Sequence, residues 1–322
     1  MGKVAILFAG QGAQKPGMCH ELAQAEPAAQ AVFELADAVR PGTSEQCFSG
    51  TAEELRQTAN TQPCVFAADL ACARALAAHG VRPAAVAGFS LGEVAALAFA
   101  GALTDEEAMR LVCVRAELMD KAAHEHPGSM RAVLKLDAET VRRLAAEAGD
   151  AWPVNFNSLQ QTVVAGLPES LESLDALVRD AGGRSRALAV SGAFHSPLMA
   201  EASEGLAAYL AEAGLPGAPE LPVIANATGE AYPEAADAVG ERARLLSSQV
   251  SSPVQWVRTL ECLRDMGVGT FIEVGPGKTL TGLVSRTLEG VVALPCETPE
   301  QLAAALAAAG TDDAGAAGEK EQ

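Results

Sequence analysis

The 322-residue sequence predicts an α/β protein, with a central, mostly parallel sheet in a large body and a smaller subdomain inserted into that body. Short apolar strand patterns alternate with helical patterns through the body, as expected of helices packed on a parallel sheet. The middle of the chain instead follows the order βαββαβ, which is the ferredoxin-like arrangement. The composition, 49% hydrophobic but only 4% aromatic, suits alanine-rich helices packed on a sheet.

The first elements of the body follow from local sequence signals. Residues 3–8 form an apolar run that stops at Gly10-Gln11-Gly12, which indicates a buried strand entering a tight loop. Helical spacing over residues 62–79 ends at a glycine, and a short apolar run at 83–87 leads to a glycine-flanked serine. Helical composition resumes over residues 93–99.

A further helix carries a charged residue on its apolar face. Thr104-Asp105-Glu106-Glu107 is a capping box and predicts a helix from there to about Ala123. Arg115 lies within the apolar stripe of this helix, which should face the core. A buried charge without a partner is costly, so Arg115 must meet a protein carboxylate or an anionic ligand. In the second case its planar fork suits a substrate carboxylate.

The inserted subdomain is expected over residues 127–190, inside a body formed by residues 1–126 and 191–310. Its expected elements are a strand at 130–136, a helix at 138–147, strands at 152–156 and 162–165, a helix at 171–180 and a strand at 184–190. Residues 311–322 offer nothing apolar to bury, so we expect a disordered tail there.

Charge and cysteine content exclude several classes of function. Lys and Arg number 23 against 41 Asp and Glu, a net charge of −18, so the chain has no general attraction for nucleic acid or anionic membranes. Seven scattered cysteines without a C-x-x-C pair indicate neither a disulfide framework nor a zinc site. The chain shows no signal-peptide pattern and no apolar stretch near 20 residues, so we expect a cytoplasmic protein without a bound metal.

Gly88-Phe89-Ser90-Leu91-Gly92 fits the pattern G-x-S-x-G of a nucleophile elbow. In an elbow the glycines permit a sharp turn from strand to helix that presents the serine. A strand signal precedes this pentapeptide and a helical signal follows it, as the elbow requires. The alternative is a serine that caps a glycine-flanked helix.

A serine nucleophile needs a base, and His195 is the best candidate. It follows an apolar strand and lies in a loop that leads to a helix at Pro197, and α/β proteins place their sites in such loops. The alternative is a structural histidine with satisfied hydrogen bonds. The other histidines have plain explanations at helix ends or in polar breaks; they are His20, His79, His124 and His126.

Two glycine-rich segments could bind anionic groups. Gly10-Gln11-Gly12 could present backbone N–H groups to an oxyanion, together with the N–H of Leu91, unless it is simply a tight turn. Gly275-Pro276-Gly277-Lys278-Thr279 ends like a phosphate-binding loop. That pattern requires a glycine where Ile272 stands, so we reject it.

Taken together, these motifs resemble the malonyl-CoA:acyl carrier protein transacylases and the related acyltransferase domains of polyketide synthases. The match runs nearly end to end. It includes Phe8-Ala9-Gly10-Gln11-Gly12-Ala13-Gln14, Thr61-Gln62-Pro63, Gly88 to Glu93, Arg115 with Met119, Asn155-Phe156-Asn157-Ser158, Gly192-Ala193-Phe194-His195-Ser196, Pro253-Val254-Gln255-Trp256 and Glu273-Val274-Gly275-Pro276-Gly277.

The resemblance implies a hydrolase-like α/β body, a ferredoxin-like insert and a set of roles. The site residues that it implies are Ser90 as nucleophile, His195 as base, Gln11 and Leu91 as oxyanion donors, and Arg115, Phe194, Met119, Gln62 and Asn157 at the substrate. The backbone carbonyl of Gln249 would orient the histidine. Phe194 is typical of malonyl-selecting members, because relatives with branched substrates usually carry serine there.

One position departs from the family pattern. Members usually read G-H-S-x-G, and this chain has Phe89 where the histidine is expected. The nucleophile and its base are intact, so we expect the change to affect acyl preference or rate rather than the reaction.

The resulting hypothesis is a cofactor-free, monomeric enzyme that transfers malonyl from malonyl-CoA to the phosphopantetheine thiol of acyl carrier protein, in fatty-acid or polyketide synthesis. One rival is a serine esterase or thioesterase, which would admit water to the acyl-enzyme. A second rival is a non-catalytic, carrier-binding scaffold that keeps the fold. Candidates for the carrier's docking patch are Lys278, Arg286 and Arg184.

Overall fold

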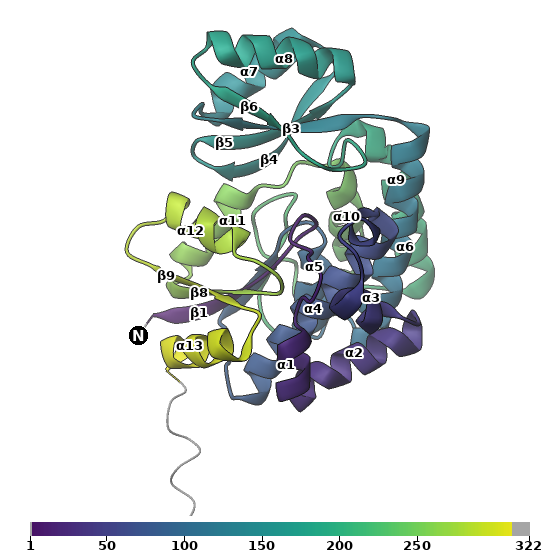
Figure 1. Cartoon of the computed structure of the whole chain (residues 1–322), viewed down its shortest axis with the longest axis vertical. Coiled ribbons are helices and arrows are strands. Elements are labelled where there is room, and N and C mark those ends of the chain that lie inside the picture. The colour runs from purple at the N-terminus through teal and green to yellow at the C-terminus, as the bar shows by residue number, and fades with distance from the viewer. Residues whose placement is uncertain (1, 311–322) are drawn as a thin grey trace, which may run out of the picture.

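A computed structural model describes residues 2–310 and confirms the predicted α/β class. It contains a five-stranded sheet and a four-stranded sheet, which lie at different levels along the long axis of the molecule (Figure 1). None of the helices within residues 2–310 has the length and apolar character needed to span a bilayer. The predicted tail, residues 311–322, lies outside the described residues.

The larger sheet forms the centre of the body. Its strands are β1 (Lys3–Phe8), β2 (Ala85–Gly88), β7 (Val223–Ile224), β8 (Val268–Val274) and β9 (Val292–Cys296), in the spatial order β7-β2-β1-β8-β9. All four neighbouring pairs are parallel. Parallel strands buried on both faces are apolar throughout, and β1 fits this rule because its last four residues are fully buried.

Helices cover both faces of this sheet. They are α1 (His20–Ala25), α2 (Pro27–Val39), α3 (Thr43–Ser49), α4 (Thr58–Ala78), α5 (Gly92–Phe99), α6 (Asp105–Glu125), α9 (Ala200–Ala213), α10 (Val239–Ser248), α11 (Trp256–Asp265), α12 (Thr279–Thr287) and α13 (Pro299–Ala309), with 3-10 turns η1 (Glu54–Arg56), η2 (Pro197–Met199) and η3 (Gln249–Ser251). The capping box at Thr104 forms as predicted. Helix α4 begins one turn before the predicted start at residue 62, because tertiary packing buries Thr58 and Thr61 and outweighs the break signal of Pro63.

The smaller sheet has the predicted ferredoxin-like topology. Its strands β3 (Ser129–Leu134), β4 (Ala151–Ser158), β5 (Gln161–Gly166) and β6 (Arg184–Ala187) pair antiparallel in the order β4-β5-β3-β6. Helices α7 (Ala138–Ala148) and α8 (Pro168–Asp180) pack on one face with a core of their own. The subdomain boundaries at 127 and 190 stay a prediction.

Three strands of the small sheet end two or more residues away from the expected position, and one of them, β4, extends to Ser158 instead of residue 156. The first strand stops at Leu134 instead of residue 136, because Lys135 adopts a positive φ of 69°. The last strand was expected over 184–190 but ends at Ala187. Its partner β3 begins at Ser129, and the hydrogen bond from Leu188 N to Met130 O is the last rung of this pairing. The residues that follow are therefore free to line a cavity.

The uncovered face of the small sheet lies over the carboxyl ends of the large-sheet strands, with α7 and α8 on the far side (Figure 1). Backbone hydrogen bonds connect the two parts: Phe156 N donates to Val254 O at 3.0 Å, and Val254 N donates to Val154 O at 2.7 Å. The loops that follow β1 and β2 therefore face a space that is bounded on its other side by β4 and β5.

Candidate active site

Ser90 lies in a strained turn between β2 and α5. Its φ of 54° is in the left-handed region, which costs a non-glycine residue about 1–3 kcal/mol. The flanking glycines are required sterically, because a Cβ on Gly88 would collide with the backbone of Gly92, and one on Gly92 would collide with the Phe8 carbonyl. The turn is held by Asn226, whose Oδ1 accepts from Ser90 N and whose Nδ2 donates to Gly88 O, each at 2.6 Å.

His195 is placed to take a proton from this serine. Its Nε2 lies 2.8 Å from Ser90 Oγ, and its Nδ1 lies 2.8 Å from the backbone carbonyl of Gln249. Because a carbonyl only accepts, Nδ1 carries the hydrogen and Nε2 is left to accept from the serine hydroxyl. Burial, with a further contribution from Arg115, lowers the pKa of His195 to about 4. The imidazole is therefore neutral at physiological pH.

Arg115 lies beside the serine and has neutral partners. Its guanidinium is 1% exposed and donates to Gln62 Oε1 at 2.6 Å, Gln249 Oε1 at 2.8 Å and Ser90 Oγ at 3.1 Å. Its Nε has no hydrogen-bond partner, and among residues 2–310 no carboxylate forms an ion pair with it. Gln62 is itself fixed by a contact of its Nε2 with Met119 Sδ at 3.4 Å. Of the two alternatives left open by the sequence, the structure favours an anionic ligand.

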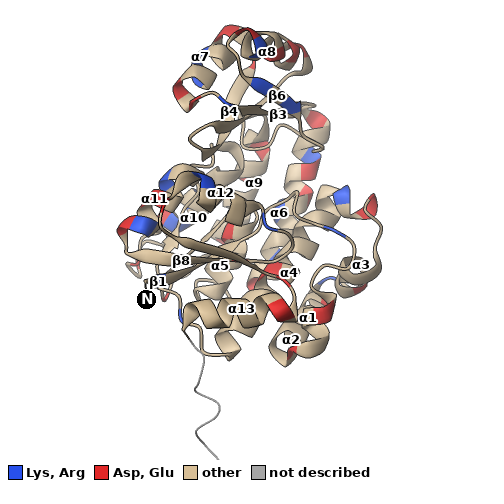
Figure 2. Ribbon diagram, turned by 60° about the vertical axis from the view of Figure 1, so that its left-hand side comes forward, with Lys and Arg blue, Asp and Glu red and all other residues tan. Residues whose placement is uncertain are grey.

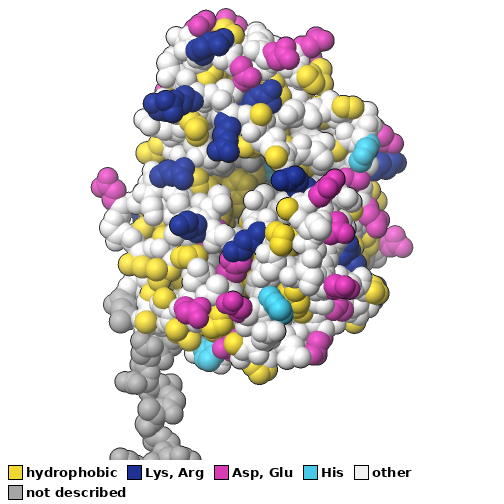
Figure 3. Space-filling model, in the orientation of Figure 1, with side chains coloured by type: hydrophobic (Ala, Val, Ile, Leu, Met, Phe, Trp, Pro, Cys, Tyr) yellow, Lys and Arg dark blue, Asp and Glu magenta, His cyan; other side chains and the backbone are white. Residues whose placement is uncertain are grey.

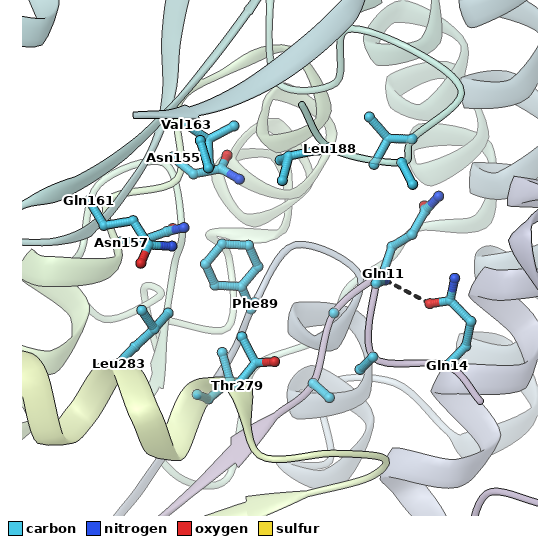
Figure 4. A pocket seen from close by; sticks show the side chains of 18 of the residues that line it. Gln11, Gln14, Phe89, Asn155, Asn157, Gln161, Val163, Leu188, Thr279 and Leu283 are labelled. Atoms are coloured by element: carbon cyan, nitrogen blue, oxygen red, sulfur yellow. Dashed lines mark hydrogen bonds between the residues drawn. The ribbon is translucent and has the colours of Figure 1, made fainter. Parts of the chain in front are cut away.

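A cavity of about 470 Å³, lined at the elbow by Phe89, the residue before Ser90, opens between the two sheets. Figure 4 shows Phe89 near its middle, Asn155 and Asn157 of β4 on one side, and Gln11 on the other. Within the described residues, neither the N–H of Gln11 nor that of Leu91 has a hydrogen-bond acceptor. Two unpaired amides next to an activated serine can bind an oxyanion. On the surface, the hollow is bordered by Lys and Arg side chains (Figure 3).

Comparison with known proteins places this geometry in a family. The model of the acyl transferase domain matches residues 6–312. The chain belongs to the acyl transferase family. It is 36% identical over 312 residues to the malonyl CoA-acyl carrier protein transacylase of Bacillus subtilis, covering 95% of this chain and 97% of that protein.

Solved structures give the same assignment for this acyl transferase. A malonyl-transacylase in complex with the acyl-carrier protein of a type II polyketide synthase has a TM-score of 0.89 at 36% identity, covering 95% of this chain and 99% of that chain. The acyl-carrier-protein S-malonyltransferase of Burkholderia pseudomallei has a TM-score of 0.88 at 36% identity, with 95% and 99% coverage.

Most of the predicted site residues of the acyl transferase fall into two groups, and Leu91 and Phe194 lie next to them in the chain. A buried hydrogen-bonded set around the serine hydroxyl consists of Ser90, His195, Arg115, Gln62, Met119 and Gln249. Gln11 and Asn157 line the open cavity, and the N–H of Leu91 belongs to the turn itself. Phe194 is 5% exposed and directly precedes His195. The other four histidines lie at the surface in hydrogen bonds or ion pairs with neighbouring side chains or backbone.

Three residues of the site had no role in the sequence-based prediction. Asn226 holds the elbow, and Glu93 and Tyr232 form a buried hydrogen-bonded pair behind it. Asn226 and Tyr232 leave no signal, because each lies more than 130 positions from its partner. Glu93 does leave one: it is a carboxylate in the first turn of an otherwise apolar helix, an anomaly of the same kind as Arg115 on the apolar face of α6.

Phe89 lies on the cavity side of the elbow. Its ring packs edge-on against Trp256, with centroids 5.1 Å apart, and lines the open cavity. The buried residues around the Ser90 hydroxyl, such as Arg115 and Gln62, are absent from the cavity lining. In this acyl transferase Phe89 therefore faces the open cavity rather than the buried side chains around Arg115.

Proposed function

We propose that this acyl transferase moves a malonyl group from malonyl-CoA to the phosphopantetheine thiol of an acyl carrier protein through a malonyl ester of Ser90. The observation that carries the proposal is Arg115, a buried guanidinium 3.1 Å from Ser90 Oγ with neutral partners. A bidentate cation at that distance selects an acyl group that ends in a carboxylate. The names of the relatives, and the carrier in one of the similar structures, support the same reaction.

In the first half-reaction Ser90 Oγ attacks the thioester carbon as its proton passes to His195 Nε2. The N–H groups of Gln11 and Leu91 stabilise the oxyanion that forms. Collapse of this intermediate breaks the C–S bond, and the imidazolium returns its proton to the departing CoA sulfur. The products are a malonyl ester on Ser90 and free CoA.

The second half-reaction reverses these steps with a different thiol. His195 takes the proton of the carrier's phosphopantetheine thiol, the sulfur attacks the ester carbon, and Ser90 Oγ leaves and regains its proton. One thioester is exchanged for another, so the reaction is nearly balanced in energy. We propose that it needs no cofactor, because the histidine carries the single proton in both halves.

We assign acyl selection to the buried side chains beside Ser90. Arg115 binds the malonyl carboxylate, while Gln62 and Met119 fix the guanidinium through the contacts described above. Phe194 restricts the space beside the base, so that a methyl branch on the acyl chain would meet an aromatic ring. The alternative of altered acyl preference, raised by Phe89, is not favoured, since that ring lies toward the open cavity.

We assign the pantetheine arm to the open cavity. Its wall combines the Phe89 ring with the amide side chains of Asn155, Asn157 and Gln11 (Figure 4). Amide groups on an apolar floor match the amides and methylenes of a pantetheine chain. The Oδ1 atoms of both asparagines are buried without a partner in the described residues, so these side chains offer unused hydrogen-bonding capacity.

The carrier would dock at the mouth of this cavity. Basic residues occur on β6 and on α12, where the ribbon is coloured blue in Figure 2. Arg286 of α12 also reaches across to the small sheet, with Nη1 donating to Gln161 Oε1 at 2.8 Å. A protein of net charge −18 needs such a local patch to receive an acidic partner, so Lys278, Arg286 and Arg184 are the proposed contacts. We propose that the enzyme acts as a cytoplasmic monomer.

Intact-protein mass spectrometry after mixing with malonyl-CoA, acetyl-CoA or methylmalonyl-CoA tests the function. We expect a malonyl adduct that is absent in Ser90→Ala and loses its preference for malonyl in Arg115→Ala. Arg110→Ala is the matched control, because Arg110 lies on the same helix in an exposed ion pair with Glu106. Release of free malonate without a thiol acceptor would identify the thioesterase instead, and carrier binding without any adduct would identify the scaffold.

A further inference from the structure

Glu93 is a buried carboxylate one helical turn after the nucleophile. It is 0% exposed, and its Oε2 accepts from Asn226 N at 2.9 Å and from Gln249 Nε2 at 3.0 Å. Its Oε1 accepts from the Tyr232 hydroxyl. In the described part of the chain, no Lys, Arg or His forms an ion pair with it. Glu93 is thus fully hydrogen-bonded but has no direct counter-ion.

One side-chain amide separates Glu93 from Arg115. Gln249 Oε1 accepts from Arg115 Nη2 at 2.8 Å, while its Nε2 donates to Glu93 Oε2 at 3.0 Å and to Ser90 O at 2.7 Å. The cation and the anion therefore share one water-excluded site and compensate each other through a neutral bridge. A buried site of this kind strongly disfavours any net charge.

The other titratable groups around Glu93 keep one charge state near pH 7, since Tyr232 and His195 are neutral and Arg115 is a cation. Burial raises the pKa of Tyr232 well above its ordinary value, and the negative charge of Glu93 adds to this. His195, on the far side of Ser90, is neutral above about pH 5 because burial lowers its pKa to about 4. Arg115 on α6 stays protonated, with a pKa lowered by burial to about 10. The charge of the site thus depends on Glu93 and on the bound acyl group.

Burial raises the pKa of Glu93 to about 7, against the opposing effects of its three hydrogen-bond donors and of Arg115. The free site holds one cation and one anion when Glu93 is ionised. A malonyl carboxylate bound at Arg115 would add a second anion to the same site. It would also neutralise the guanidinium field that favours the ionised form of Glu93.

We propose that Glu93 takes up a proton from solvent when the malonyl group is loaded on Ser90, so that the bound carboxylate replaces Glu93 as the counter-ion of Arg115. This inference rests on the proposed function. Above about pH 7, where Glu93 is ionised in the free enzyme, the site then keeps zero net charge before and after loading. Glu93 acts as a positioning residue in this scheme, because it affects the substrate through Arg115 and Gln249 and touches no reacting atom.

The sign of the pH dependence follows from linkage. Below about pH 7 Glu93 is already protonated in the free enzyme, so loading takes up no proton and its equilibrium is flat. Above that pH the free enzyme holds an ionised Glu93 that must be protonated on loading. The equilibrium constant for malonyl loading should then fall by up to about tenfold per pH unit.

The test measures the malonylated fraction by intact mass at a fixed ratio of malonyl-CoA to CoA, from pH 6 to 8, in the wild type and in Glu93→Gln. The variant mimics the protonated form and shares every pH effect of the CoA thiol, so the ratio of the two profiles isolates Glu93. We expect the ratio of the wild-type to the Glu93→Gln loading equilibrium to be level below about pH 6.5 and to fall above about pH 7. Parallel profiles over the whole range would overturn the inference.

Two further measurements guard against a misfolded variant. In weakly buffered solution at pH 7.8, a pH indicator should report uptake approaching one proton per malonyl group loaded on the wild type. Tyr232→Phe removes one donor to Glu93, so the fall should move to higher pH. Malonylation without proton uptake would overturn this inference alone, whereas the absence of any malonyl adduct would overturn the proposed function with it.

Discussion

The Nδ1 atom of His195 lies 2.8 Å from the backbone carbonyl oxygen of Gln249, where many serine enzymes place a carboxylate. A carbonyl fixes the tautomer of the imidazole without adding a negative charge. The same residue contacts Arg115 and Glu93 through its side chain, so Gln249 connects the base with the buried charges of the site. Truncating its side chain removes these contacts and leaves the carbonyl in place.

The first prediction concerns the acid limb of the reaction. Only neutral imidazole accepts the Ser90 proton, and burial lowers the pKa of His195 from 6.5 to about 4. The single-turnover rate of malonylation should therefore hold from pH 7 down to about pH 5 and fall only below that. Glu93 is protonated between pH 5 and 7, and because the loaded enzyme also holds a protonated Glu93, this does not oppose malonylation. Rapid-quench mass spectrometry checks the profile, and a fall centred near pH 6.5 would contradict it.

The second prediction concerns the elbow. Asn226 is fully buried and clamps Ser90 N and Gly88 O, so Asn226→Ala leaves both groups unpaired and should cost about 1–3 kcal/mol of stability. The rate of malonylation should fall as well, because the strained φ of Ser90 loses its support. Asn226→Asp is the informative comparison: it keeps the acceptor for Ser90 N and loses the donor to Gly88 O. Thermal unfolding and the rate of adduct formation are measured for both variants. Equal losses of stability and rate in Asn226→Ala and Asn226→Asp would show that the hydrogen bond to Ser90 N is unimportant.

Much of this site could be predicted because its signals are local. The glycines of the elbow occur within five residues, and Arg115 is anomalous within a single helix stripe, all of whose members are buried. The topology of the small subdomain follows from the order of its elements. Each of these inferences needs only spacing along the chain and the geometry of one helix or strand.

What could not be predicted depends on contacts between distant segments. The end of β6 is set by where β3 begins, and the clamp of Asn226 joins residues 136 positions apart. The side of the elbow on which Phe89 lies is decided by its packing against Trp256, far along the chain. The sequence predicts an effect of Phe89 on acyl preference or rate; the position of its ring in the cavity lining does not favour an effect on acyl preference, and the effect on rate stays a prediction.

The third prediction follows from that position. Phe89→His should change the KM for CoA thioesters by a few fold and leave the ratio of malonyl to methylmalonyl loading nearly unchanged, because the ring lines the open cavity. The edge-on contact with Trp256 offers a second readout, since a protonatable ring at 5.1 Å should quench its fluorescence as the pH falls. Phe99→Leu, on α5 but away from the cavity lining, serves as the control. A shift in the malonyl preference with an unchanged KM would move Phe89 into the acyl site.

The fourth prediction tests the docking patch. Arg286→Glu should raise the KM for an acidic carrier protein about tenfold or more and leave transfer to free pantetheine unchanged, because a small neutral thiol has no acidic surface for Arg286 to attract. Arg143→Glu is the matched control, since Arg143 forms an exposed ion pair with Glu147 on α7. Arg286 also bonds to Gln161 across the two sheets, so its reversal could disturb the cavity itself. The Lys278 side chain makes no such bond in the described residues. Lys278→Glu therefore separates a loss of carrier docking from a disturbance of the cavity. Equal losses with carrier and pantetheine would place the defect in the cavity, and no loss with either would remove α12 from the docking surface.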